Sequence, residues 1–228
     1  SGHLWKLLDW FKINKGASTT RIAINSNLQC DTKMIEQLLD RADSAPLDIY
    51  TSNESLVNQA EYIRDGLDWQ TWTNNFEMLA ASDKLRGLHN MCTINALCLE
   101  SLPEFLDYLL TIKAKHGKDF PSFTLNILRF PSFQSALALP DHIRTEHKNR
   151  LQKWFDKNVN NTLLHEHELN QTQRLLDYLD VVKTPHSEAF DTPKLHNDFK
   201  HFYNQYDVRR NKNFMSAFPS MKEWFNEL

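Results

Sequence analysis

The sequence is poor in glycine, with five glycines among 228 residues. Because β-sandwiches depend on glycine at their many tight turns, this scarcity argues against such a fold and favours helices. Long apolar runs are missing as well, since none approaches the roughly 20 residues that a helix needs to cross a bilayer. No secretory signal is visible. We therefore expect a cytoplasmic protein that makes no membrane contact.

Cysteine and charge of one sign are also scarce. Cys30, Cys92 and Cys98 are odd in number and widely spaced, which suits neither a disulfide framework nor a zinc site. We expect reduced thiols and no metal site. The formal net charge is −3 with both signs mixed along the chain, so nothing indicates a nucleic-acid partner. Apolar residues are plentiful at 41%, enough for a sizeable core.

Helical and strand patterns alternate along the first part of the chain. Apolar spacing predicts helices near residues 4–15, 31–39, 69–81 and 102–115, and short apolar stretches predict strands at 21–25, 47–51, 88–94 and 123–128. Gly16 is expected to end the first helix. After Phe130 only helices are indicated, over residues 141–158, 166–182, 194–209 and 219–228. Alternation of this kind is typical of βαβ units with a parallel sheet.

The predicted fold class is α/β, a partial (βα) TIM-like barrel with parallel strands over residues 4–140. A helical C-terminal region over residues 141–228 is expected to pack on it. Four strands cannot close a barrel, so the strand over residues 21–25 should present an open edge. Self-association through that edge is one expected consequence.

Sites in βα barrels form at the carboxyl ends of the strands, on the loops that follow. That rule selects short polar side chains here, namely Asn25, Ser26, Asn27, the residues from Thr51 to Ser55, Thr93, Asn95, Arg129 and Ser132. They suit a hydroxylated or zwitterionic ligand, and no histidine among them could activate a nucleophile. The competing interpretation is that polar residues end strands for ordinary turn reasons.

Several segments carry a family resemblance. Ser52-Asn53-Glu54-Ser55, followed by the segment 60–69 (AEYIRDGLDW), resembles the barrel of radical S-adenosylmethionine (SAM) enzymes. In that family a strand ends in Ser-x-Asp-Gly, and an E-x-I-R-x-G segment precedes the next helix. Segment 91–97 is similar to the family's T-x-N strand end. Segments 126–131 and 138–140 resemble the region after the barrel in members with a SPASM or twitch extension.

The resemblance implies that the intact parent cleaves SAM reductively to a 5′-deoxyadenosyl radical, with a [4Fe–4S] cluster. It implies that Asn25 offers a polar group to the SAM ribose, and Ser52 a hydroxyl to the SAM amino acid or ribose. Arg64 would pair with the SAM carboxylate, and Asn95 would lie near the adenosyl group. Glu54, in the loop after Ser52, stands where the family usually has Asp. The substrate is unknown, and peptide modification is the commonest role of extended relatives.

Two departures from the family pattern limit these expectations. The C-x3-C-x2-C motif and the Gly-Gly-Glu segment are absent, so this chain alone is expected to be an inactive fragment that holds neither cluster nor SAM. Ser55 replaces the usual glycine, which leaves the loop geometry open. The alternative function is a non-catalytic α/β binding or scaffold module that uses an open sheet edge. A metal-free barrel enzyme such as an aldolase is disfavoured, because no strand ends in a lysine or a paired acid and base.

Weaker signals have plainer interpretations. Without the resemblance, Arg64 is equally expected in a surface ion pair with Glu61 or Asp68. The run from His165 to Glu168 predicts a solvated helix start rather than a metal site, because residues two apart do not share a helix face. Cys92 and Cys98 are too few for an auxiliary cluster.

Overall fold

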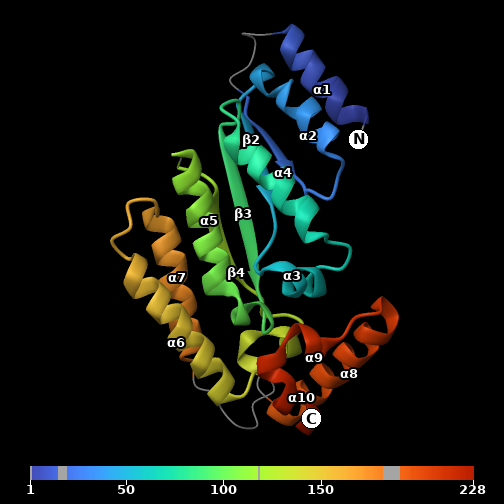
Figure 1. The fold of residues 1–228 in the computed structure, drawn as a ribbon, viewed down its shortest axis with the longest axis vertical. Coiled ribbons are helices and arrows are strands. Elements are labelled where there is room, and N and C mark those ends of the chain that lie inside the picture. The colour runs from blue at the N-terminus through green and yellow to red at the C-terminus, as the bar shows by residue number, and fades with distance from the viewer. Residues whose placement is uncertain (1, 15–19, 118, 182–190) are drawn as a thin grey trace.

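The computed structural model describes residues 2–14, 20–117, 119–181 and 191–228. Four strands form one parallel sheet in the order β1-β2-β3-β4 (Figure 1). The strands are β1 (Ile22–Asn25), β2 (Leu47–Thr51), β3 (Gly87–Ile94) and β4 (Ser122–Ile127). The α/β class, the parallel sheet and all four predicted strands are confirmed.

Helices connect the strands. They are α1 (Gly2–Ile13), α2 (Thr32–Leu39), α3 (Val57–Ile63), α4 (Trp69–Ala81) and α5 (Leu102–His116). All of these except α3 were predicted. The seven-residue α3 has no side-chain cap at Leu56, and it begins at Val57 with a φ of 43°, so no usual sequence signal marks it. The stop predicted at Gly16 lies outside the described residues.

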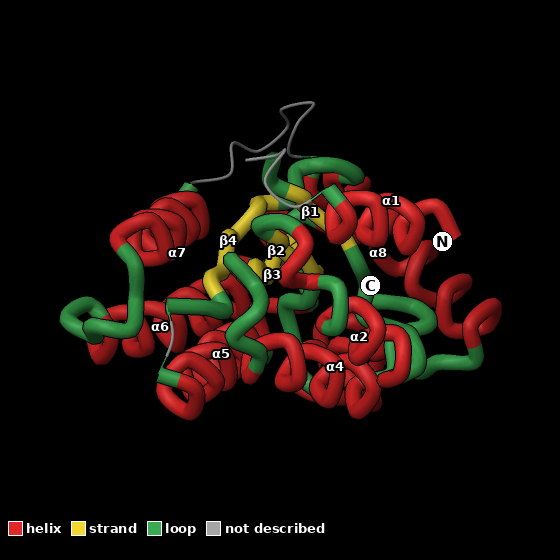
Figure 2. The backbone as a smooth tube through the Cα atoms, turned by 90° about the horizontal axis from the view of Figure 1, so that it is seen from above, coloured by secondary structure: helices red, strands yellow, loops and turns green. Residues whose placement is uncertain are grey.

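The two faces of the sheet differ in burial. Figure 2 shows α2, α4 and α5 on one side, where Ile49, Leu88 and Leu125 are completely buried. The alternate residues, such as Tyr50 and His89, point to the other face and are only half-buried. The helices therefore cover one face of this sheet more completely than the other.

The remaining helices are α6 (Asp141–Asn158), α7 (Glu166–Leu179), α8 (Thr192–Arg210), α9 (Phe214–Ala217) and α10 (Lys222–Glu227). Short 3-10 turns punctuate the chain at Ala42–Ser44, Cys98–Glu100, Ser132–Gln134, Ala136–Ala138 and Pro219–Met221. Figure 1 shows α6 and α7 beside α5 and β4, whereas α8, α9 and α10 lie beyond the carboxyl ends of the strands. The four helices predicted after Phe130 are thus present. None of the helices in the described ranges is both long and apolar enough for a bilayer crossing.

Aromatic packing and hydrogen bonds hold α8 and α9 against α3. The Tyr62 ring contacts the rings of Tyr203, Phe214 and Phe218 at centroid distances of 6.1, 6.1 and 5.2 Å. The Tyr62 hydroxyl donates to Asp207 Oδ1 at 2.7 Å. Because Tyr62 directly precedes the end of α3, this contact fixes the C-terminal helices next to the strand ends.

Helix α7 covers the outer edge of β4 with polar side chains. The amide of Phe123 donates to Glu168 Oε1 at 2.9 Å, and Arg174 Nη2 donates to the carbonyl of Leu125 at 2.6 Å. Glu168 is fully buried and pairs with Lys113 Nζ at 2.7 Å. The predicted solvated helix start is therefore wrong for Glu168, because its carboxylate turns inward to the sheet edge. His165 does serve as the N-cap of α7.

Candidate functional site

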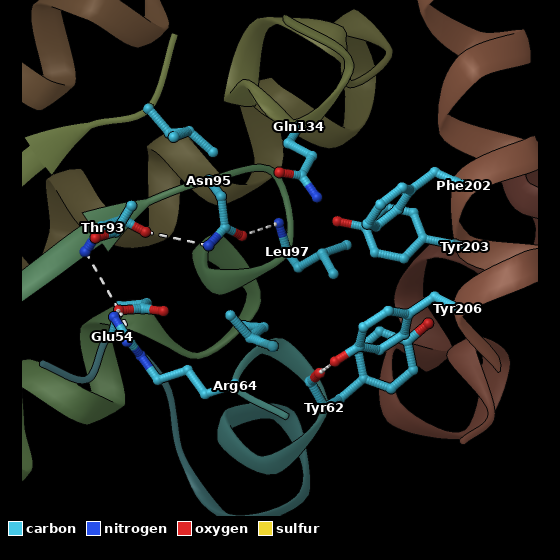
Figure 3. A pocket seen from close by; sticks show the side chains of 12 residues that line it. Glu54, Tyr62, Arg64, Thr93, Asn95, Leu97, Gln134, Phe202, Tyr203 and Tyr206 are labelled. Atoms are coloured by element: carbon cyan, nitrogen blue, oxygen red, sulfur yellow. Dashed lines mark hydrogen bonds and ion pairs between the residues drawn. The ribbon is translucent and has the colours of Figure 1, made fainter. Parts of the chain in front are cut away.

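A cavity of about 320 Å³ lies at the carboxyl end of the sheet. Four parts of the chain line it, and they meet only in the folded molecule (Figure 3). The twelve lining residues are Glu54, Tyr62, Ile63, Arg64, Thr93, Asn95, Leu97, Leu128, Gln134, Phe202, Tyr203 and Tyr206. Its position matches the general rule that ligands of parallel α/β sheets bind at the carboxyl ends of the strands.

An ion pair between Glu54 and Arg64 forms one end of the cavity. Arg64 Nη2 lies 2.5 Å and Nε 3.2 Å from Glu54 Oε2, which also accepts from the amide of Thr93 at 3.2 Å. Glu54 is 1% exposed, whereas the Arg64 side chain is 28% exposed. Burial raises the pKa of Glu54, while the Arg64 charge opposes that rise. Arg64 thus forms an ion pair, but with Glu54 rather than with Glu61 or Asp68.

The loop after β2 holds Glu54 in place through local hydrogen bonds. Asn53 Oδ1 accepts from the amides of Glu54 at 2.9 Å and Ser55 at 3.4 Å, an Asx turn. Ser55 Oγ lies 2.5 Å from Ser101 Oγ. Ser55 is not among the residues with positive φ, so this loop does not require the glycine that the family usually has there.

Asn95 orders the turn after β3. Its Oδ1 accepts from the amides of Leu97 at 2.9 Å and Cys98 at 3.1 Å, and its Nδ2 donates to the Thr93 carbonyl at 3.1 Å. These contacts account for the oxygen and for one amide hydrogen. No other acceptor among the described residues takes the second hydrogen on Nδ2, which is open to a ligand in the cavity.

Four aromatic rings form the opposite end of the cavity, which we call the aromatic wall: Tyr62 from α3 and Phe202, Tyr203 and Tyr206 from α8. The Phe202 and Tyr206 rings are stacked, with centroids 5.9 Å apart. The Tyr206 hydroxyl donates to the Tyr62 carbonyl at 2.8 Å. Burial and the neighbouring Asp207 raise the pKa of Tyr62, so its phenol stays neutral. The wall is therefore uncharged and offers ring surface.

Of the residues predicted from the sequence, four meet in this cavity: Glu54, Arg64 and Asn95, which the resemblance also singled out, and Thr93, which only the strand-end rule selected. Asn25, at the end of β1, is exposed and does not line the cavity. Ser52 is half-buried and does not line it either. The cavity is therefore built on the ends of β2, β3 and, through Leu128, β4, but not on the end of β1.

Sequence reasoning missed the aromatic wall and Gln134. A usable signal exists for the wall, because Phe199, Phe202, Tyr203 and Tyr206 follow one another at helical spacing. That spacing indicates an aromatic helix face, but it gives no hint that the face meets a strand end far back in the chain. Gln134 lies in an irregular turn and carries no pattern of its own.

Two of the three thiols lie in the protein interior. Cys92 and Cys98 are fully buried, and burial raises the pKa of each. Cys30 is only partly buried and lies next to Asn75 of α4. Over the described part of the chain, no three His, Cys, Asp or Glu side chains are grouped as metal ligands would be.

The sequence matches no protein-family model, no curated protein and no solved structure. The arrangement has the means to bind a ligand. It combines an ion pair with unused hydrogen-bonding capacity, two amides and an aromatic surface. No nucleophile paired with a base lies among the residues that line it.

Proposed function

We propose that this chain is part of a radical SAM enzyme and that the cavity contributes to the SAM pocket. Three residues that the resemblance assigns to this region, Glu54, Arg64 and Asn95, line the same cavity. That convergence is the observation that carries the proposal. In the parent, SAM would supply the 5′-deoxyadenosyl radical, and the half-exposed face of the sheet would form part of the barrel interior.

The cavity has the chemistry to hold the amino-acid part of SAM. Arg64 directs Nε and Nη2 to Glu54, and its Nη1 donates to none of the described residues. A guanidinium with a free N–H edge is suited to a carboxylate. Arg64 would hold that carboxylate, and Asn95 would lie beside the adenosyl group.

An iron–sulfur cluster does not fit the donor set of this chain. Cys92 and Cys98 are inside the protein with raised pKa values, and the described residues contain no group of three metal-ligating side chains that includes Cys30. A cluster needs accessible thiolates. The parent's cluster would therefore be held by residues outside this sequence, and this chain alone would be inactive.

The proposal is tested by measuring SAM binding with saturation-transfer NMR, which detects weak ligands. The sequence alone predicts no bound SAM on this chain, but the cavity leads us to expect weak SAM binding, which Arg64→Lys should weaken further. The matched control is Arg86→Lys, because Arg86 also pairs with a buried carboxylate, Asp48, but outside the cavity. Absence of SAM binding, or equal loss in both variants, would contradict the proposal. Reading the source gene upstream of Leu4 for a C-x3-C-x2-C motif tests the parent enzyme directly.

A second candidate is a non-catalytic binding module that pairs through the edge of β1. The observation that favours it is the position of β1, which pairs with a strand on one side only among the strands of the described ranges. The amides of Ile22 and Ser26 donate to β2-side carbonyls, so those of Ala23 and Asn25 point away from β2. Concentration-dependent association that Ala23→Pro abolishes would support this candidate.

A further inference from the structure

We infer that the cavity takes one ligand lengthwise, with a zwitterionic amino-acid head on Glu54 and Arg64 and a planar ring on the aromatic wall. This inference rests on the proposed function where the ligand is SAM. It also goes further, because it assigns the α8 rings to ligand binding and makes Glu54 the partner of an ammonium group.

The first observation is the unequal use of the Glu54 carboxylate. All three of its hydrogen bonds, from Arg64 and from the Thr93 amide, go to Oε2. Within the described ranges no donor reaches Oε1, and Figure 3 shows this oxygen turned toward the space between the labelled side chains. A carboxylate oxygen that faces a cavity and accepts from no donor of the described residues can take a strong, charge-assisted hydrogen bond from an ammonium group that enters the cavity.

The second observation is that Arg64 offers the complementary half of the same site. Its Nη1 has no partner among the described residues, while the other two nitrogens are held by Glu54. The Glu54–Arg64 pair has no net charge. A ligand with a single charge would therefore leave a net charge in the cavity and would pair with only one of the two residues. A ligand that carries both an ammonium and a carboxylate satisfies both free positions and preserves neutrality.

The third observation concerns the other end of the cavity. In Figure 3 the rings of Tyr62, Phe202, Tyr203 and Tyr206 face the ion pair across the cavity, with Asn95 and Gln134 along the side. The hydroxyls of Tyr62 and Tyr206 are already bound within the protein. What these two residues present is therefore ring surface, which favours a flat apolar group such as a nucleobase or an indole.

The size of the cavity agrees with a ligand of this kind. Its volume of about 320 Å³ lies at the lower end of the range for small-molecule sites. That space suits a single small ligand that spans both ends, rather than two ligands side by side. Asn95 Nδ2 and the Thr93 hydroxyl are available to polar groups in the middle of such a ligand.

The experiment compares whole and half ligands by calorimetric titration with NMR competition. S-adenosylhomocysteine carries head and ring, methionine carries the head alone, and 5′-methylthioadenosine carries the ring alone. We expect S-adenosylhomocysteine to bind at least tenfold more tightly than either half. Equal affinity of the three would overturn the inference.

Two substitutions, one at each end of the cavity, test separately which part of the ligand each end binds. Glu54→Gln keeps the shape but removes the charge, and should weaken S-adenosylhomocysteine and methionine roughly tenfold while sparing 5′-methylthioadenosine. Tyr206→Leu should weaken the two adenosyl compounds about tenfold and spare methionine. Controls outside the cavity are Asp48→Asn and Trp10→Leu, which should change none of the affinities. Circular dichroism of each variant establishes that it is folded, and Arg64→Lys replaces Glu54→Gln if the latter is not.

A second ligand series separates this inference from the SAM proposal. Tryptophan has the zwitterionic head and a ring, tryptamine lacks the carboxylate, and indole-3-propionate lacks the ammonium. Tighter binding of tryptophan than of both analogues, with adenosyl compounds inert, would support the lengthwise site and reject SAM as its ligand. If neither S-adenosylhomocysteine nor tryptophan binds, or if Tyr206→Leu acts on methionine as strongly as on 5′-methylthioadenosine, the inference is wrong.

Discussion

The two edges of the sheet are treated in opposite ways. At β4, side chains of α7 bind the outward backbone groups, with Glu168 on the Phe123 amide and Arg174 on the Leu125 carbonyl. At β1, the outward amides of Ala23 and Asn25 have no strand beside them in the described part of the chain, and both residues are exposed. The edge at β4 is covered by a helix, whereas the edge at β1 can still pair with another strand.

The covered edge at β4 depends on the buried carboxylate of Glu168, whose two oxygens both accept hydrogen bonds. The Glu168 carboxylate accepts from Lys113 Nζ at 2.7 and 2.9 Å, from the Phe123 amide at 2.9 Å and from the His165 amide at 2.8 Å. Lys113 Nζ donates in addition to the Leu163 carbonyl at 2.9 Å. Since a buried ion is tolerated only with such partners, ending the sheet at β4 requires the whole network. A sheet edge can therefore be closed by hydrogen bonds from side chains as well as by pairing with another strand.

The largest predicted effect comes from breaking that network. Lys113→Met leaves Glu168 buried without its cation and should lower the free energy of unfolding by about 3–5 kcal/mol. Urea denaturation measures the change. Lys115→Met is the matched control, because Lys115 pairs with Glu77 at the surface and should contribute at most about 1 kcal/mol. Similar losses in the two variants would show that the covered edge has no special dependence on the buried pair.

The next largest effect is a loss of stability in acid that is caused by a buried histidine of α6. His147 of α6 is 2% exposed, its ring nitrogens have no partner among the described residues, and burial, with the Arg150 charge, lowers its pKa to about 4. The unfolded chain takes up this proton below about pH 6.5, but the folded chain does not until about pH 4. Stability is therefore lost as the pH falls, by about 2 kcal/mol at pH 5 from this group.

His147→Leu should remove that part of the pH dependence. Urea denaturation at pH 7 and pH 5 checks it, since the wild-type protein should lose about 2 kcal/mol more than the variant over this interval. If both proteins lose the same amount, His147 is not neutral in the folded state.

A smaller effect is expected at Gln171, which lies one helical turn after Glu168 in α7. Gln171 Oε1 accepts from the Leu125 amide at 3.4 Å and from Arg174 Nη2 at 2.7 Å. Gln171→Ala should lower the free energy of unfolding by only about 1 kcal/mol, because the Gln171 side chain is only half-buried and a water molecule can replace its oxygen. Hydrogen exchange at Leu125 should accelerate while exchange at Phe123 stays slow. Equal acceleration at both would mean that α7 had moved as a whole.

The last prediction tests the open edge without any substitution. The amides of Ala23 and Asn25 should exchange rapidly in dilute protein, whereas those of Phe123 and Leu125 should be protected. If β1 pairs with a second copy, protection at Ala23 and Asn25 should rise with protein concentration and the other two should not change. Protection of Ala23 at every concentration would instead show that this edge is already covered within one chain.

Much of the fold was predictable from local pattern. Ile22 and Ile24 mark β1, and the apolar spacing of Leu102–His116 marks α5, because both burial patterns repeat over short distances. The helix α3 was not predictable, since it begins at a strained Val57 without a cap. Its existence depends on tertiary contacts such as the Tyr62 packing.

The candidate site was predictable only in part, for the same reason. Glu54 and Asn95 follow strands, so their meeting at one edge follows from the parallel order. The other contacts of the site do not follow from that order. No pattern in the local sequence indicates the pairing of Arg64 with Glu54 or the approach of Tyr206. The inward turn of Glu168 was missed because its partner Lys113 lies 55 residues away.

The consecutive strand order has a consequence for synthesis on the ribosome. Each strand pairs with the next one in the chain, so the sheet can grow from β1 to β4 as the polypeptide emerges. The cavity cannot, because its aromatic wall needs α8, and the Tyr62–Asp207 contact joins residues 145 positions apart. A nascent chain that stops before α8 would therefore carry the strand ends and the Glu54–Arg64 pair in an open groove. Its capacity to hold a ligand would arise only after α8 has been synthesised.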